Sequence, residues 1–376
     1  MTAVALTIAG SDPSGGAGVQ ADLRTFGALG VAGLSVITAL TVQNSQGVQS
    51  VHPVAPDVLA AQLNAILSDT RPDAVKIGML GTAAHVQVVA AALRQYTPPN
   101  IILDPVLAST GGVPLLDVDG RQALLSDLLP LCDLVTPNLD EASALTGLRV
   151  QDVSAMKEAA RRLQTLGARY ALVKGGHLHG FPYDVMPLSP TDSLNLQGTP
   201  DVWVDTPHKH GTGCLLSACI AAFLASGLSL HLSVLEAKRM VSEALRQPIV
   251  IGQGRGYPNV LWAAPRRLAR IKHERRLPKL HEIYVVTDTD LRPDRTHLEI
   301  ARAALAGGAK IIQLRDKRLP TRKLVALGKR LRQIVQKAGA QLIINDRVDV
   351  ALACDADGVH LGPDDMLPEE ARRLLG

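Results

Sequence analysis

Short apolar segments that alternate with longer helical stretches constrain the fold of the N-terminal part of this 376-residue chain. The pattern is clearest around Ala74–Met79, Ile101–Asp104, Leu134–Thr136 and Tyr170–Lys174. Such alternation is typical of an α/β fold in which helices cover both faces of a mostly parallel sheet. Ligands in these folds bind beyond the carboxyl ends of the strands. The residues at or just after these ends are Lys76, Met79, Asp104, Asn138 and Lys174.

The tetrapeptide Gly211-Thr212-Gly213-Cys214 lies where a polar stretch gives way to the apolar run Leu215–Leu224. It predicts a helix N-terminus that binds an anion, because the first-turn N–H groups are unpaired and the helix dipole is positive there. We expect the pKa of Cys214 to be lowered at this position, which suits a proton acceptor beside a transferred phosphoryl group. The alternative is a glycine-rich turn into a packing helix with a buried cysteine.

The apolar segment Val4–Ala9 runs into a glycine-rich loop, Gly10–Gly18, and then into a helical stretch that contains Asp22. No Gly-Lys-Ser/Thr follows, so the loop is not a P-loop, and its spacing differs from that of the dinucleotide fingerprint. Nicotinamide binding is therefore disfavoured.

Several further motifs follow in order along the chain. They are Ala39–Asn44, Lys76–Leu80, Asp104–Val106, Thr136–Glu141 and Val173–His177. Together with the two loops they resemble the hydroxymethylpyrimidine and phosphomethylpyrimidine kinases of the ribokinase-like superfamily, over residues 1–263. Cys214 supports the resemblance, because the related pyridoxal kinases usually carry aspartate there. The resemblance implies phosphorylation of 4-amino-5-hydroxymethyl-2-methylpyrimidine and then of its monophosphate, with ATP as co-substrate. The enzymatic alternative is a pyridoxal kinase.

The resemblance also implies the roles of individual residues. The pyrimidine pocket would be lined by Gly10, Asp22, Gln43, Met79 and Val106. The amide of Gln43 donates and accepts at once, which suits an aminopyrimidine edge. Two alternatives stay open, since Gln43 could brace a loop and Met79 could be ordinary core.

The phosphate end of the site is assigned in the same way. Gly211, Gly213 and Cys214 would be catalytic, and Lys174, Asn138 and Thr212 would bind ATP. Asp104 and Glu141 would hold Mg²⁺ mostly through waters, as a cation that keeps its hydration shell prefers. The alternative for Asn138 and Glu141 is a helix-capping pair. Residues 178–207 form an irregular segment that could close over the site.

The composition of the chain is typical of a soluble globular protein. Apolar residues make up 47% of the chain and charged residues 20%, which is ordinary for a soluble protein. No apolar run approaches the ~20 residues that span a bilayer, and the first residues lack the basic start of a signal peptide. We expect a cytoplasmic protein without a membrane partner. The cysteines, Cys132, Cys214, Cys219 and Cys354, are scattered without a Cys-x-x-Cys pair, which argues against a zinc site and a disulfide framework, and Cys219 is expected in the core.

A basic segment separates the two halves of the chain. Residues 266–279 hold seven Lys or Arg and one Glu, and Pro278 ends any helix before Lys279. A nucleic-acid patch is one interpretation. We favour a solvated linker helix over residues 264–280 and no nucleic-acid partner, because no aromatic residues interleave the charges.

Residues 281–376 carry a second series of apolar strands that end in polar residues. The strands are Ile283–Asp288, Lys310–Lys317, Gln341–Asp346 and Gly358–Gly362. Polar residues at successive strand ends are typical of a (β/α)8 (TIM) barrel site. The motifs resemble the N-terminal half of thiamine phosphate synthase. The resemblance implies that Gln313, Arg315, Lys317 and Asn345 bind the pyrimidine diphosphate and that Asp346 and Asp365 hold its Mg²⁺.

The predicted barrel is incomplete, because only about half of its strands fit into residues 281–376. We expect this half to be inactive as a synthase by itself, and a noncatalytic binding or assembly module is the alternative. A homodimer through the kinase domain is implied by the resemblance. The partners would otherwise be small molecules, the aminopyrimidine and ATP.

Overall fold

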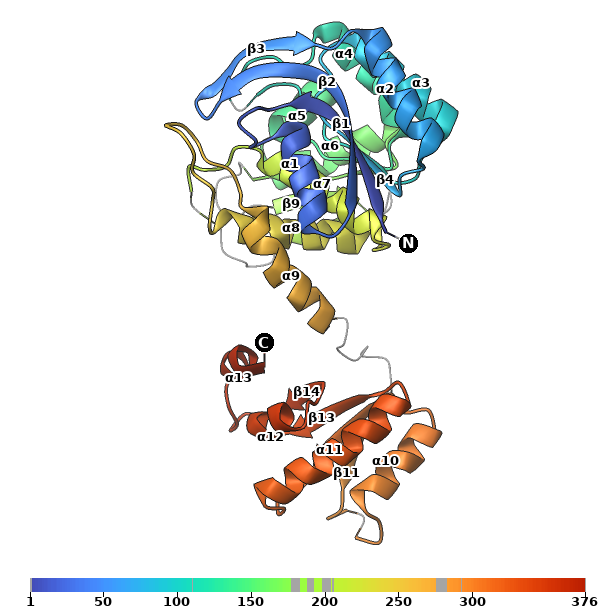
Figure 1. Ribbon diagram of the computed structural model, residues 1–376, viewed down its shortest axis with the longest axis vertical. Helices are drawn as coiled ribbons and strands as arrows, with labels where there is room; N and C mark the ends of the chain where they lie inside the picture. Colours follow the sequence, from blue (N-terminus) through green and yellow to red (C-terminus); the bar gives the residue numbers. More distant parts are fainter. Residues whose placement is uncertain are drawn as a thin grey trace. The chain divides into compact units, whose positions relative to one another are not determined.

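The structure is a computed structural model that describes residues 2–109, 111–176, 183–187, 193–197, 204, 206–274, 283–291 and 293–375. The chain divides into two compact units, Met1–Arg267 and Leu268–Gly376. Each unit is an α/β structure with its own sheet (Figure 1).

The N-terminal unit is built on a seven-stranded sheet with the strand order β3-β2-β1-β4-β5-β6-β7. Its strands are β1 (Val4–Ser11), β2 (Ala32–Asn44), β3 (Gly47–Pro53), β4 (Ala74–Ile77), β5 (Ile101–Leu103), β6 (Leu134–Val135) and β7 (Tyr170–Ala171). All neighbouring pairs are parallel except β2 and β3. The prediction of a mostly parallel sheet is confirmed.

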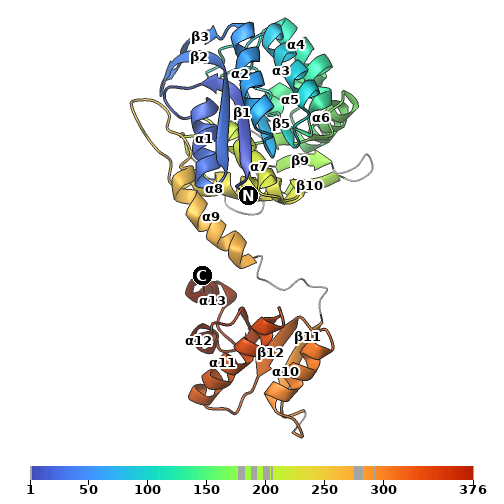
Figure 2. The same ribbon diagram turned by 45° about the vertical axis from the view of Figure 1, so that its right-hand side comes forward.

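Helices cover both faces of this sheet. The elements on the two sides are α1 (Gly18–Ala28), α2 (Pro56–Asp69), α3 (Ala83–Tyr96), α4 (Val118–Ala123), η1 (Leu124–Leu128), η2 (Leu129–Leu131), α5 (Leu139–Thr146), α6 (Val153–Thr165), α7 (Thr212–Ala225) and α8 (Leu230–Leu245). The helices α1, α7 and α8 lie together, while α2, α3 and α4 lie on the other side (Figure 2). The core on that second side also takes in α5 and α6.

Burial on both faces explains the sequence of the strands. Parallel strands covered on both sides are continuous apolar runs, because neither face meets water. The strand β4 follows this rule in three positions, but its third residue, Lys76, is charged and fully buried.

A smaller antiparallel sheet of the N-terminal unit begins at the end of the predicted strand Tyr170–Lys174 and continues into a segment that we expected to be irregular. It pairs β8 (Val173–Gly175) with β9 (Tyr183–Pro187), and β9 with β10 (Ser193–Gln197). Backbone pairing across a hairpin thus orders the described part of residues 178–207, which corrects the expectation of an irregular segment. The remainder of that segment, apart from residues 204, 206 and 207, lies outside the described residues, as does His177.

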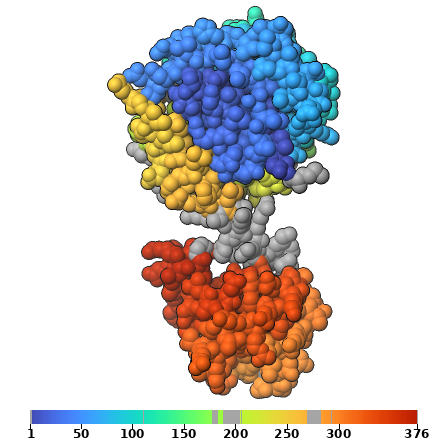
Figure 3. Space-filling model, in the orientation of Figure 1, coloured from blue at the N-terminus to red at the C-terminus, as the bar shows by residue number. Residues whose placement is uncertain are grey.

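The end of the N-terminal unit folds back onto its beginning. Gly254 N donates to Ser45 Oγ (3.0 Å) and Arg255 N to the Ser45 carbonyl oxygen (2.9 Å). This segment lies against the turn between β2 and β3, and its gold atoms meet the blue ones in Figure 3. The helix α9 (Val260–Glu274) follows, and its Arg267 is buried and paired with Glu236 (2.5 Å). The basic segment is therefore solvated only in part, and Pro278 and Lys279 lie outside the described residues.

The second unit has a four-stranded parallel sheet with the order β11-β12-β13-β14. Its elements are β11 (Tyr284–Asp288), α10 (His297–Ala306), β12 (Ile311–Arg315), α11 (Thr321–Lys337), β13 (Gln341–Asn345), α12 (Val348–Ala353), β14 (Gly358–His360) and α13 (Pro368–Leu375). Strands that pair in chain order with helices between them match the expected partial (β/α)8 barrel. Across the residues described for both units, no helix has the length and apolar character that crossing a membrane requires.

Candidate active site

The candidate site is built around the N-terminus of α7. Gly211 precedes the helix with a φ of 73°, in the left-handed region that favours glycine. A Cβ atom here would overlap the carbonyl oxygen of Gly16, so the loop Gly10–Gly18 touches the start of α7. Both glycine-rich loops found in the sequence therefore meet at one place.

A lysine and an aspartate lie beside the first turn of α7. A Cβ atom on Gly213 would be 3.2 Å from Lys174 Nζ and 3.6 Å from Asp104 Oδ2. Lys174 Nζ donates to Asp104 Oδ1 (2.9 Å), and Ser217 Oγ, one turn into α7, lies 3.3 Å from Asp104 Oδ2. Burial by itself would raise the pKa of Asp104, but the charges of Lys174 and Lys76 hold it below its usual range. A cation, a carboxylate and the first-turn N–H groups of α7 thus lie close together, as phosphoryl transfer requires.

Cys214 lies in the first turn of α7 and is half-buried. Desolvation of its thiol raises the pKa of Cys214 to about 11, although Lys76 and the Gly18 N–H lower it. The expectation of a lowered pKa is therefore wrong, because burial outweighs the helix N-terminus and the nearby ammonium. Cys214 carries a thiol at neutral pH. Cys219 is fully buried, as expected.

Asn138 and Glu141 form a capping box at the start of α5. Asn138 N donates to Glu141 Oε2 (2.8 Å) and Glu141 N donates to Asn138 Oδ1 (2.8 Å). The capping interpretation that the sequence left open is therefore correct as a structural role. Burial raises the pKa of Glu141 to about 7 even though Lys174 lowers it. The carboxyl groups of Asp104 and Glu141 suit a hydrated divalent cation, which would also favour the ionised form of Glu141.

The residues proposed for the pyrimidine pocket divide into two groups. Gly10, Met79 and Val106 lie together, since a Cβ atom on Gly10 would be 3.0 Å from Met79 Sδ and both Met79 and Val106 belong to one apolar cluster. Gln43 lies at the end of β2, where its amide reaches His210.

Asp22 is held by two hydrogen bonds in the interior, near Cys214. Its side chain is fully buried, and its Oδ2 accepts from Lys76 Nζ (2.7 Å) and Thr7 Oγ1 (2.6 Å). It lies on α1, beneath the loop Gly10–Gly18, and reaches no surface. Electrostatic attraction to Asp22 keeps the pKa of Lys76 above its usual range in spite of burial, so Lys76 is a buried ammonium.

The sequence interpretation missed the roles of Lys76, Asp12 and His210. The signal for Lys76 was a lone charged residue inside a fully apolar strand, which requires a buried partner. Asp12 and His210 are 198 positions apart and pair at 3.0 Å, so no local pattern could reveal them.

In the second unit the predicted residues gather at the strand ends. Gln313 Nε2 donates to Asn345 Oδ1 (3.0 Å), Arg315 pairs with Asp288, and Lys317 Nζ lies 3.6 Å from Asp346 Oδ2. Asp365 stands apart from these contacts and accepts from the Gly362 N–H (2.6 Å). Sequence reasoning overlooked Asp288, which ends its strand β11.

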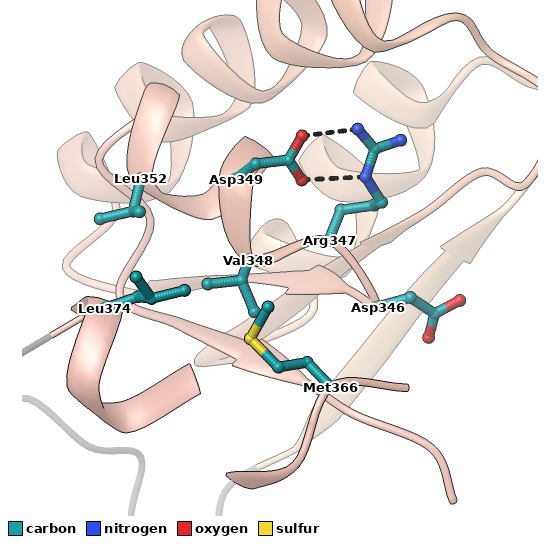
Figure 4. A pocket seen from close by; sticks show the side chains of 7 residues that line it. All are labelled: Asp346, Arg347, Val348, Asp349, Leu352, Met366 and Leu374. Atoms are coloured by element: carbon teal, nitrogen blue, oxygen red, sulfur yellow. Dashed lines mark hydrogen bonds and ion pairs between the residues drawn. The ribbon is translucent and has the colours of Figure 1, made fainter. Parts of the chain in front are cut away.

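A pocket of about 320 Å³ in the second unit lies between α12 and α13, next to the end of β13 (Figure 4). Its wall is apolar, with Val348, Leu352, Met366 and Leu374, and a paired Arg347 and Asp349 lie at its rim. It contains Asp346 but none of the other predicted ligand residues. Among the described residues, no group of three or more His, Cys, Asp or Glu could hold a metal ion directly.

The fold and the loop at α7 define the N-terminal unit as a ribokinase-like phosphotransferase. Residues 12–259 match the family model "Phosphomethylpyrimidine kinase", and residues 283–376 match "Thiamine monophosphate synthase". The chain belongs to the phosphomethylpyrimidine kinase family, joined to a segment of the thiamine monophosphate synthase family.

Relatives support both halves of this assignment. A chloroplastic thiamine biosynthetic bifunctional enzyme of Arabidopsis thaliana is 41% identical over 99% of this chain and 72% of its own length. A hydroxymethylpyrimidine/phosphomethylpyrimidine kinase of Haemophilus influenzae is 44% identical over 69% of this chain and 97% of its own.

Two solved structures have the fold of the N-terminal unit. A phosphomethylpyrimidine kinase of Clostridium difficile matches with a TM-score of 0.57 and 36% identity, covering 64% of this chain and 99% of its own. An ADP complex of Bacillus subtilis pyridoxal kinase matches with a TM-score of 0.62 and 35% identity, covering 71% and 99%. The fold of the N-terminal unit is therefore shared by a phosphomethylpyrimidine kinase and a pyridoxal kinase.

Proposed function

We propose that this protein transfers phosphate from ATP to 4-amino-5-hydroxymethyl-2-methylpyrimidine and then to the resulting monophosphate, in thiamine biosynthesis. The observation that carries the proposal is the meeting of Lys174, Asp104 and the first turn of α7 around Cys214. The names of the relatives supply the substrate, and the cysteine supports it over pyridoxal.

Each of these residues has a separate role in the proposed reaction. Lys174 meets the ATP phosphates, and the N–H groups of Gly213 and Cys214 stabilise the charge that develops on the moving phosphoryl group. Asp104 and Glu141, with the cap residue Asn138, would hold Mg²⁺ through waters, and the ion would neutralise phosphate charge. The Cys214 thiol orients the substrate hydroxyl, because a loose transition state requires little base strength.

A steady-state assay with Mg²⁺-ATP tests this division. We expect Cys214→Ala to lower kcat/KM by about 100-fold, because the substrate hydroxyl loses its orienting group, and Lys174→Met to lower kcat/KM with a higher KM for ATP. Cys219→Ala is the matched control, because it removes a thiol from the same helix outside the site and should leave the kinetics unchanged. Equal activity of Cys214→Ala and Cys219→Ala would contradict the role of Cys214.

A pyridoxal kinase is the second candidate, favoured by the structural match to enzymes of that name. It is distinguished by adding pyridoxal as sole substrate and as competitor. Turnover of pyridoxal with no turnover of the aminopyrimidine would establish it.

We propose also that the second unit does not make thiamine phosphate by itself. Among the residues that the structure describes, the sheet order leaves β11 and β14 with a neighbouring strand on one side only, whereas a closed barrel has no such edge. Condensation of pyrimidine diphosphate with thiazole phosphate by the purified chain would overturn this proposal. A binding or assembly role for this unit would instead show as a changed oligomeric state when the unit is removed.

We further propose a homodimer formed through the N-terminal unit and a cytoplasmic location, from the family resemblance and composition. Light scattering tests the first and a fluorescent fusion the second. The Arabidopsis relative is chloroplastic, so an organelle is the contrasting outcome.

A further inference from the structure

Three side chains from distant parts of the chain meet beside the proposed pyrimidine pocket. His210 Nε2 lies 3.0 Å from Asp12 Oδ2 and 3.2 Å from the terminal amide of Gln43. The same imidazole nitrogen faces both groups, so its proton decides how each can bind to it.

Asp12 is an ionised acceptor. Its carboxylate accepts from Ser14 N (2.8 Å), Ser14 Oγ (2.7 Å) and Ala17 N (2.9 Å). Burial acts to raise the pKa of Asp12, but these bonds and His210 hold it below its usual value. A carboxylate has no proton to give, so Nε2 of His210 must donate to it, in the neutral ring as in the imidazolium.

A donating Nε2 fixes one end of the Gln43 amide. The atom placed 3.2 Å from His210 is Gln43 Nε2, but Nε2–H of His210 cannot accept from an NH2 group, so the amide is turned over and its oxygen is assigned to this position. The oxygen and nitrogen of an amide are told apart by their hydrogen-bond partners, and here the partner is a donor.

Thr41 fixes the other end independently. Its hydroxyl has one hydrogen, which it donates to the carbonyl oxygen of Ser11 (2.8 Å). The atom placed 3.3 Å from this hydroxyl is Gln43 Oε1, but a hydroxyl that has already donated its hydrogen can only accept, so the NH2 group is assigned to this position instead. The two contacts give the same orientation, with the oxygen toward His210 and the nitrogen toward Thr41.

We propose that Asp12, His210 and Thr41 are positioning residues that lock the Gln43 amide and thereby select substrates by the order of donor and acceptor on one ring edge. The locked amide keeps one N–H and one oxygen lone pair for a ligand. A 4-aminopyrimidine offers an amino donor beside a ring-nitrogen acceptor, so its amino group lies on the His210 side. A 4-oxopyrimidine offers the reverse order and is rejected. This inference rests on the proposed function, since it concerns the same pocket.

The test compares kcat/KM for the 4-amino substrate and its 4-oxo analogue in the full chain. We expect a preference of about 100-fold for the amino compound, because the wrong order leaves buried polar groups unpaired. His210→Phe and Thr41→Val should each reduce the preference about tenfold, mainly through KM for the amino compound. His210→Gln should restore it, because one NH2 group donates to both Asp12 and Gln43.

The control is His52→Phe, an exposed histidine on β3 outside this cluster, which should leave the preference unchanged. An unchanged preference in folded His210→Phe and Thr41→Val would overturn the inference while leaving the kinase assignment intact. Should His210→Phe fail to fold, the near-isosteric Thr41→Val decides alone. Failure of the unmodified chain to phosphorylate the amino compound would instead refute the proposed function.

Discussion

At the scale of single residues, burial decides the chemical state of the site. The pKa of Cys214 lies near 11 because desolvation of the thiol exceeds the attraction of Lys76 and the helix N-terminus. Lys76 stays charged in the same interior because Asp22 lies 2.7 Å away. The two groups thus differ because Lys76 has an oppositely charged group at hydrogen-bond distance, whereas the attraction of Cys214 to Lys76 does not outweigh its desolvation.

The state of Cys214 predicts a pH dependence. The folded chain disfavours the thiolate, so alkylation by iodoacetamide should be slow at pH 7 and rise toward a midpoint near 11. The measurement uses a Cys132→Ala, Cys219→Ala, Cys354→Ala variant, with the urea-unfolded chain as the reference near the ordinary value of 9.0. A midpoint below the unfolded value would show that the helix N-terminus outweighs burial.

The buried pair of Lys76 and Asp22 predicts a stability effect. Lys76→Met leaves the Asp22 carboxylate buried without its cation, which should lower the free energy of unfolding by about 3–5 kcal/mol. Arg169→Met breaks the exposed pair with Asp133 and should cost about 0–1 kcal/mol. Urea denaturation measures both. Equal, small losses would mean that the interior pair is not ionised.

At the scale of elements, the start of α7 depends on backbone shape. Gly211 has a positive φ and no room for a Cβ atom, whereas Gly227, just past the end of the same helix, has a φ of 80° and open space. The two glycines therefore separate conformational strain from steric overlap.

This difference predicts unequal alanine substitutions. Gly227→Ala should cost about 1 kcal/mol of unfolding free energy, from strain alone. Gly211→Ala should cost more and abolish phosphoryl transfer, because the loop Gly10–Gly18 must move away. Denaturation and kinase assays on both variants measure this. Full activity in Gly211→Ala would mean that the contact between the loops is not needed for catalysis.

Features that depend on neighbouring residues could be predicted from the sequence, whereas features that depend on contacts between distant segments could not. The segment around Lys76 and the run Leu215–Leu224 were predictable because periodicity and glycine spacing are local. The hairpin of β9 and β10 was missed, since backbone pairing there competes with a proline-rich composition. The pKa of Cys214 and the partner of Asp22 were beyond the sequence, because both arise from packing between segments far apart in the chain.

At the scale of the whole molecule, the two units each have their own sheet and core. Since Arg267 of α9 is bound to Glu236, the N-terminal unit needs the first half of that helix. A chain that ends after Glu274 should keep kcat and KM for the aminopyrimidine, whereas one that ends before Arg267 should lose stability. Loss of kinase activity in the longer truncation would show that the second unit takes part in the kinase reaction.

The central claim is that this chain phosphorylates the hydroxymethyl aminopyrimidine twice. The most direct test incubates the purified chain with Mg²⁺-ATP and this pyrimidine, and separates the phosphorylated products by chromatography over time. The account predicts that the monophosphate appears first and is then converted to the diphosphate, and that Cys214→Ala slows both steps. Absence of any phosphorylated pyrimidine, with ATP hydrolysis or with phosphorylation of pyridoxal alone, would contradict it.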